Sequence, residues 1–265
     1  MLAILRNYTL FERRPSGRIK LIPRYPQVEA VEAILKRVNQ EDSRQGLIWH
    51  YQGTGKTLLI AFAALRLLND RSERIPTVVI VLDRVDLVEQ TVRQFQTVGM
   101  PRLRVAGSGE ELRGMLADDQ RGIIVTTVFK FADAPVLNRR DDVVVFIDEA
   151  HRTQEGILGD DLRRALPNAQ FFGLTGTPIM DSERDTFKLF GDSRDVRWVL
   201  NEYSMSRAII DGTSVPIHLE SRLVDYQIDA ATLDVAFSEM ATEEALDDEA
   251  REALASRAAS ARTVF

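Results

Sequence analysis

Six short apolar runs follow one another from residue 46 onward, and they leave few folds open to the chain. They are "GLIWHY", "TVVIVLD", "LRVAG", "GIIVTT", "DVVVFID" and "AQFFGLT". Most are nearly continuous in Val, Ile and Phe, which is typical of strands buried on both faces of a parallel sheet. The segments "TLLIAFAALRLL" and "VDLVEQTVRQF" between them have helical spacing. This alternation predicts an α/β domain with a mainly parallel sheet sandwiched by helices.

The segments on either side of these runs set the expected domain boundaries. "YPQVEAVEAILKRV" predicts a helix over residues 25–38, with Pro26 at its start. After about residue 180 we expect a short helix at 203–211 closed by Gly212, an extended stretch, and an Ala/Glu-rich helix from about 231. The predicted organisation is a connecting segment at 1–23, the α/β domain at 24–200 and a linker at 201–265.

Composition excludes several classes of protein. The 265 residues contain no cysteine, and the three histidines are far apart, so neither a disulfide framework nor a structural zinc site is expected. No apolar run approaches the eighteen or so residues of a membrane span, and the first residues lack the pattern of a signal peptide. We therefore expect a cytoplasmic protein without membrane contact.

Charge is unevenly distributed along the chain. The formal net charge is −6, which argues against a broadly basic surface for nucleic acid. Residues 1–37 nevertheless carry eight Lys/Arg against three Glu, whereas residues 229–251 carry eight Asp/Glu against one Arg. A DNA contact would thus have to be local, and the simplest interpretation of both segments is a solvated face.

The stretch "WHYQGTGKT" ends like a phosphate-binding loop, although His50 stands where the general pattern has its first glycine. Gly53 and Gly55 would let the backbone wrap around phosphate oxygens at the positive end of a helix. Lys56 would reach the β- and γ-phosphates, and the Thr57 hydroxyl would coordinate Mg²⁺. The alternative is a glycine-rich turn that holds no ligand.

An acidic pair at the end of a later strand provides the second half of such a site. In "VVVFIDEAH", Asp148 follows a buried strand and would hold Mg²⁺, while Glu149 would polarise the attacking water as general base. Asp-Glu is common at ordinary turns, so the prediction depends on its combination with the loop.

The motifs "GTGKT", "DEAH" and "LTGTP", in this order, resemble motifs I, II and III of superfamily 2 helicases and translocases. "RYPQVEAV" resembles the adenine-reading Q motif of that superfamily. The segments "WHYQGTGKT", "DEAHRTQ", "GLTGTPI" and "YSMSRAIIDGTSVPIHLESR" resemble the corresponding segments of the motor, or restriction, subunit of type I restriction-modification enzymes. The resemblance covers roughly residues 24–228 and implies a RecA-like P-loop NTPase domain.

The resemblance implies a role for each matching residue. Gln27 would read the adenine edge, with an exposed glutamine at a helix start as the simpler alternative. His151 would couple hydrolysis to domain movement, unless it is a capping or core histidine. The remaining assignments are the triphosphate cradle Gln52, Gly53, Thr54, Gly55, Lys56 and Thr57; the coupling residues Thr175, Gly176 and Thr177; and the DNA contacts Arg84, Thr126 and Thr127. The two strand threonines need no ligand if they are simply buried.

The resemblance also implies substrates and partners. They are ATP, Mg²⁺, double-stranded DNA, and the methyltransferase and specificity subunits of a restriction complex. Motors of this superfamily hydrolyse ATP between two RecA-like domains, of which we recognise one in these residues. We therefore expect the chain alone to bind ATP, to hydrolyse it slowly, and neither to cut nor to translocate DNA. The alternatives are another superfamily 2 helicase and a non-catalytic nucleotide-binding or assembly module.

Overall fold

The structure of the protein is a computed structural model, which describes residues 6–40, 43–69, 75–117, 121–151, 157–180 and 185–216. The chain divides into two compact units, residues 1–216 and residues 217–265. The second unit lies outside the described residues. It includes most of the expected extended stretch and the helix expected from about residue 231, so these two predictions lie outside the described residues.

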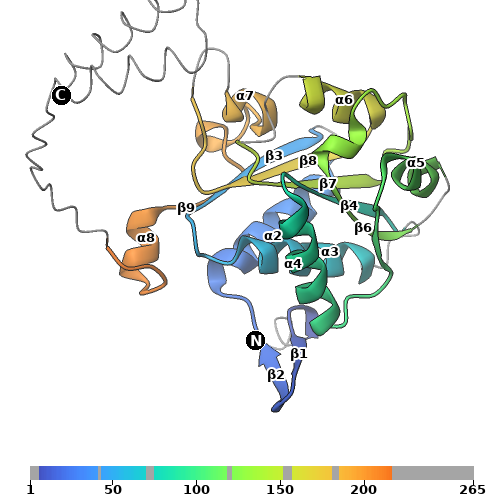
Figure 1. The fold of residues 1–265 in the computed structure, drawn as a ribbon. Helices are drawn as coiled ribbons and strands as arrows, with labels where there is room; N and C mark the ends of the chain where they lie inside the picture. The colour runs from blue at the N-terminus through green and yellow to red at the C-terminus, as the bar shows by residue number, and fades with distance from the viewer. Residues whose placement is uncertain are drawn as a thin grey trace, which may run out of the picture. The chain divides into compact units, whose positions relative to one another are not determined.

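A seven-stranded sheet forms the centre of the first unit (Figure 1). Its strands lie in the order β5-β6-β4-β7-β8-β3-β9, and all neighbours pair in parallel. The strands are β3 (Gln45–His50), β4 (Thr77–Leu82), β5 (Leu103–Val105), β6 (Gly122–Thr127), β7 (Val143–Asp148), β8 (Gln170–Thr175) and β9 (Asn201–Tyr203). Because parallel strands all end at the same edge, the loops after β3, β7 and β8 lie beside one another.

Helices cover both faces of this sheet (Figure 1). One face carries α2 (Tyr25–Val38), α3 (Lys56–Asn69) and α4 (Val85–Thr97). The other carries α5 (Gly109–Ala117), the 3₁₀ turn η1 (Val128–Phe131), α6 (Ile157–Ala165) and α7 (Thr186–Phe190). The chain continues through η2 (Val196–Trp198) and β9 to α8 (Met205–Ile210). The three-layer α/β architecture expected from the sequence is confirmed.

The core lies in two layers, one on each side of the sheet. Alternate residues of β4 illustrate this, because Val78 and Ile80 face the α2–α4 layer whereas Val79 and Val81 face the other. All four are fully buried. A strand that contributes to both layers needs apolar residues at every position, which explains the unbroken apolar runs in the sequence.

Three local expectations need correction. The helix expected at 203–211 is shorter, because Tyr203 belongs to β9 and Ser204 caps α8 through its hydroxyl. The run "LRVAG" forms only the three-residue edge strand β5 and is largely exposed. Val85 belongs to the helical spacing of "VDLVEQTVRQF" but is 63% exposed, because it is the first residue of α4 and precedes the part that packs on the sheet.

The segments outside the predicted domain are more structured than expected. Within residues 1–23 lies a separate antiparallel hairpin of β1 (Leu10–Arg14) and β2 (Gly17–Leu21). The expected linker from residue 201 begins with β9, which pairs with β3 and so belongs to the sheet. Among the described helices, none has the length and apolar character needed to cross a bilayer.

Candidate nucleotide-binding site

The phosphate-loop candidate connects β3 to α3. His50 is the last residue of the strand and Lys56 the first of the helix. Between them Gly53 and Gly55 have φ of 78° and 84°, a region that favours glycine. The Thr54 hydroxyl donates to the Tyr51 carbonyl at 2.6 Å and closes the turn. The two glycines therefore make the bend, and His50 does not take part in it.

Gln27 fixes this loop from the start of α2. Its Nε2 donates to the Gly55 carbonyl at 3.0 Å, while its Oε1 accepts from the Arg24 amide at 2.8 Å. A Cβ on residue 55 would lie only 2.7 Å from that Nε2, so a larger residue here would displace the Gln27 amide. Gln27 is 4% exposed. The structure places it against the phosphate loop, and adenine recognition by this residue stays a prediction.

The acidic pair lies next to the loop. Asp148 ends β7, Glu149 follows it, and the Lys56 Nζ is 3.7 Å from the Glu149 Oε1. Lys56 is only 9% exposed, so this amine and carboxylate interact with little screening by water. The other carboxylate oxygen of Glu149 is buried without a hydrogen bond. The fold thus brings residues 56 and 149 together, as the two motifs predicted.

Asp148 has an unusual electrostatic environment. Burial raises its pKa to about 6; the Lys56 amine opposes this shift, and the Glu149 carboxylate adds to it. Burial thus destabilises the ionised form of this carboxyl group. A nearby cation would stabilise that form, because a positive charge favours the carboxylate. The Asp148 carboxyl group therefore suits the neighbourhood of a divalent ion, and its assignment with the Thr57 hydroxyl as a ligand stays a prediction.

The residues assigned to coupling also form a connected group. The His151 Nδ1 is 2.8 Å from the Thr175 Oγ1 and 3.4 Å from the Glu149 Oε2. The Thr177 amide donates to the same Thr175 hydroxyl at 3.0 Å. These contacts connect the end of β7 with the end of β8, and the role of this group in coupling stays a prediction.

Gly176 lets the loop after β8 approach the phosphate loop. A Cβ at this position would meet the Gln52 backbone nitrogen at 3.0 Å and the His50 carbonyl oxygen at 3.2 Å. Gln52 itself is exposed. The two loops are therefore in contact through their backbones, and the glycine is required by packing.

The three residues assigned to DNA differ in accessibility. Arg84 caps α4 at the end of β4, and its exposed guanidinium pairs with Asp86 at 2.7 Å. Thr126 and Thr127 end β6 and are 0% and 2% exposed. Of these three residues only Arg84 has a side chain exposed to solvent, and the role of all three in DNA binding stays a prediction.

The environment of His50 was not predicted. The side chain is 1% exposed, its Nε2 lies 2.7 Å from the Asn201 Oδ1, and its ring contacts Tyr203. Both partners belong to β9, which pairs with β3 on the side away from β8. His50 therefore attaches the edge strand to the strand that leads into the phosphate loop.

Burial lowers the pKa of His50 to about 4. Below pH 6.5 the unfolded chain binds a proton at this imidazole, whereas the folded chain does so only near pH 4. Stability should therefore fall as the pH drops through this window, by about 2 kcal/mol between pH 7 and pH 5. Urea unfolding at both pH values, compared with His50→Gln, checks this, since the comparison cancels other titrating groups. An equal loss in both proteins would contradict it.

A second link to the segment after β9 was also not predicted. The Tyr25 hydroxyl donates to the Asp211 Oδ2 at 2.6 Å, and the Tyr203 hydroxyl donates to the same oxygen at 3.0 Å. Arg207 donates to the Tyr25 hydroxyl at 3.0 Å. Tyr25 lies two residues before Gln27, so the start of α2 and the end of α8 are joined close to the phosphate-loop candidate.

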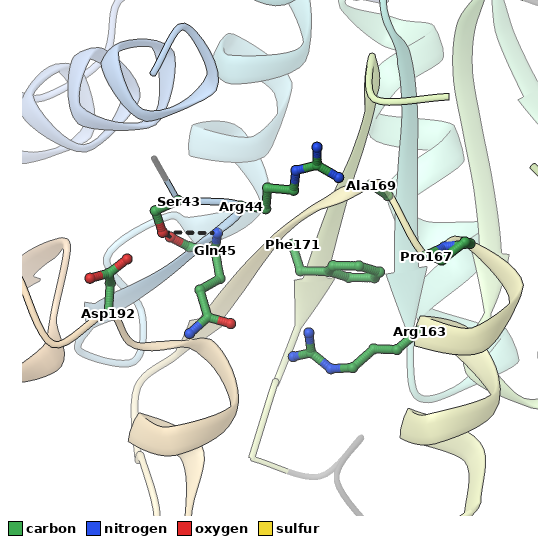
Figure 2. A pocket seen from close by; sticks show the side chains of 8 residues that line it. All are labelled: Ser43, Arg44, Gln45, Arg163, Pro167, Ala169, Phe171 and Asp192. Atoms are coloured by element: carbon green, nitrogen blue, oxygen red, sulfur yellow. Dashed lines mark hydrogen bonds between the residues drawn. The ribbon is translucent and has the colours of Figure 1, made fainter. Parts of the chain in front are cut away.

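A pocket of about 440 Å³ lies at the opposite edge of the sheet, where β3 and β8 begin (Figure 2). Figure 2 shows Arg163 beside the ring of Phe171, and its guanidinium lies 4.8 Å from that ring centroid. The Arg163 guanidinium also donates to the Leu189 carbonyl at 2.6 Å. These contacts assign Arg163 to packing, and the pocket is separate from the phosphate loop.

In a comparison with known protein families, residues 26–252 match the SWI2/SNF2 ATPase family. The chain is 35% identical over 240 residues to a putative type I restriction enzyme endonuclease subunit of Methanocaldococcus jannaschii, covering 87% of this chain and 22% of the relative. It is 36% identical over 246 residues to the type I restriction enzyme HindI endonuclease subunit of Haemophilus influenzae, covering 82% of this chain and 23% of that relative. The chain thus spans between a fifth and a quarter of the length of these relatives.

A solved structure supports the fold alone. The DNA-bound type ISP restriction-modification enzyme LlaBIII superposes with a TM-score of 0.50 at 15% identity, over 75% of this chain and 16% of that one. At this identity the likeness concerns the α/β architecture and not the chemistry of individual residues.

Proposed function

The chain belongs to the SWI2/SNF2 ATPase family and is homologous to endonuclease subunits of type I restriction enzymes, and from this premise we propose that it is their ATP-binding motor domain. In the whole cytoplasmic enzyme, ATP hydrolysis by this domain would drive translocation along double-stranded DNA. The methyltransferase and specificity subunits of the complex would be its partners. The proposal is carried by the position of Lys56, which is buried at the start of α3 and lies 3.7 Å from Glu149, directly after β7.

Binding of the triphosphate would use the loop backbone and one amine. The turn at Gly53 and Gly55 lets the amides up to Thr57 face an anion at the start of α3, where the helix dipole is positive. Lys56 would exchange its contact with Glu149 for contacts with the β- and γ-phosphates. Gln27, whose amide already holds Gly55, would sense the base and the loop together.

Hydrolysis would use the acidic pair. Mg²⁺, when bound by Thr57 and Asp148, would neutralise charge on the phosphates. Glu149 would hold the attacking water and accept its proton, and it is released for this role once Lys56 turns to the phosphates. Its Oε2, buried and without a hydrogen bond, is an available acceptor.

Communication with DNA would pass through the hydrogen bonds around Thr175. A displacement of Glu149 changes its 3.4 Å contact with His151, and His151 in turn contacts Thr175. Arg84, exposed at the same edge of the sheet, would bind a backbone phosphate in exchange for its contact with Asp86. A phosphate contact of this kind positions DNA without reading its sequence.

Calorimetric titration of the purified chain with Mg²⁺-ATP tests the proposal. We expect saturable binding at submillimolar concentration that depends on the divalent ion, because a neighbouring cation would stabilise the ionised Asp148 carboxylate. Absence of binding at millimolar Mg²⁺-ATP would contradict the proposal and favour a non-catalytic assembly module.

A further inference from the structure

The β1–β2 hairpin presents two different faces. Directly paired residues of an antiparallel ladder point to the same side, and successive pairs alternate. Leu10 with Leu21 and Glu12 with Ile19 therefore share one face, whereas Phe11 with Lys20 and Arg13 with Arg18 share the other. We call this second set, Phe11, Arg13, Arg18 and Lys20, the cationic face.

The hairpin is anchored to the domain through its base. Leu10 is buried in the α2–α4 core layer, and the neighbouring Tyr8 is 2% exposed, with its ring under Arg66. Figure 1 shows the hairpin projecting from that side of the molecule, beyond the ends of the helices. Its outer part is thus held in position while its side chains stay in water.

The cationic face lacks internal charge compensation. Phe11 is 53% exposed, and Arg13, Arg18 and Lys20 are all exposed. On the first face Arg14 pairs with Glu12 at 2.8 Å, whereas no carboxylate in the described ranges pairs with Arg13, Arg18 or Lys20. Arg13 lies directly opposite Arg18, and like charges in this arrangement destabilise a hairpin. An anionic partner would relieve this repulsion.

The spacing of the charges indicates which anion fits. Arg18 and Lys20 alternate along one strand, about 7 Å apart, and Arg13 lies about 5 Å across the ladder. Three cations in so small an area match several phosphates of one nucleic-acid strand, because a DNA strand carries a phosphate about every 3.4 Å along the helix axis. The exposed Phe11 beside them adds an apolar contact for a sugar. Residues 6–24 carry six Lys/Arg against Glu12 alone in a chain whose net charge is −6, so the positive charge is local.

We propose that the cationic face of the β1–β2 hairpin binds the phosphate backbone of double-stranded DNA. The inference rests on the proposed function for the identity of the substrate, but it adds a contact surface outside the strand-end edge that carries Arg84. The hairpin would hold the duplex without reading its sequence, since all of its contacts are to phosphate and sugar.

The test measures binding of the 265-residue chain to a fluorescein-labelled duplex by anisotropy at several salt concentrations. The triple variant Arg13→Gln, Arg18→Gln, Lys20→Gln should bind about tenfold or more weakly at low salt. The slope of log K against log salt should become shallower by about 0.9 for each phosphate that the variant no longer neutralises, about 2 to 3 in all. Phe11→Ser should weaken binding and leave the slope unchanged.

A matched control removes the same charge elsewhere. Arg104, Arg113 and Lys188 are exposed on β5, α5 and α7, and their triple change to Gln gives the same net charge. This control should bind DNA like the wild-type chain. Wild-type affinity and slope in the hairpin variant, equal losses in both variants, or no DNA binding by the wild-type chain would each overturn the inference. The first outcome would favour an acidic protein surface as the partner.

The wild-type chain and the two triple variants should bind Mg²⁺-ATP with equal affinity. Failure of the proposed nucleotide function would appear as absent ATP binding by the wild-type chain, whereas failure of the hairpin inference appears only in the DNA measurement.

Discussion

Replacement of Lys56 by alanine is expected to weaken binding of Mg²⁺-ATP by about 100-fold or more. The variant cannot form two charge-assisted hydrogen bonds to phosphate oxygens, and each contributes about 1.5 kcal/mol or more. The loss of affinity should be close to its full value because the Lys56 amine is 9% exposed and water cannot readily replace it. Isothermal titration calorimetry of the variant against the wild-type chain measures this effect.

Two further variants show whether the effect comes from the site. Lys188→Ala removes an amine whose side chain is 69% exposed, and it should leave the affinity unchanged. Glu149→Gln removes the carboxylate that holds Lys56 at 3.7 Å, so the affinity should stay equal or rise a few-fold. If Lys56→Ala binds Mg²⁺-ATP as tightly as the wild-type chain, the loop is a glycine-rich turn without a ligand.

The parts of this site that could be predicted from the sequence are local. Gly53 and Gly55 have positive φ because the turn between β3 and α3 demands it, and the spacing of glycines in "QGTGKT" already indicates such a turn. Asp148 and Glu149 follow an unbroken apolar strand. Parallel strands end at one edge, so two such motifs meet without any knowledge of the intervening helices.

The contacts that were not predicted join segments far apart in the sequence. His50 meets Asn201 only because the short strand β9 pairs with β3, and three residues give too little pattern to predict a strand. The hairpin was not predicted for a related reason: β1 has the sequence LFERR without alternation, and most positions of both strands are exposed, so no buried stripe reveals them. Backbone pairing alone defines these elements.

Arg37 illustrates the same limit with a charged residue. In the last turn of α2 an arginine predicts a solvated side chain near the negative end of the helix dipole. In the structure it is 6% exposed. Its guanidinium donates to the Gln45 carbonyl at 2.7 Å, to Ser43 and to Asp195, and it lies 3.7 Å from Asp192. The segment after α7 therefore attaches to α2 and to the start of β3 through one cation.

Replacement of Arg37 by alanine should lower the free energy of unfolding by about 3–5 kcal/mol. The cost comes from Asp195, whose side chain is 13% exposed and whose Oδ2 already lacks a hydrogen bond, because removing the guanidinium leaves a buried, uncompensated carboxylate. Urea unfolding followed by circular dichroism at pH 7 measures the change. Arg93→Ala, which breaks an exposed pair with Glu89, should cost less than about 1 kcal/mol.

A double replacement separates the charge from the packing. In Arg37→Met with Asp195→Leu, the unpaired carboxylate is gone and apolar groups occupy the space, so much of the stability should return. If the double variant is as unstable as Arg37→Ala, the hydrogen bonds of Arg37 to Gln45 and Ser43 account for the effect instead. A destabilisation in Arg37→Ala no larger than in Arg93→Ala would show that water enters this cluster and solvates Asp195.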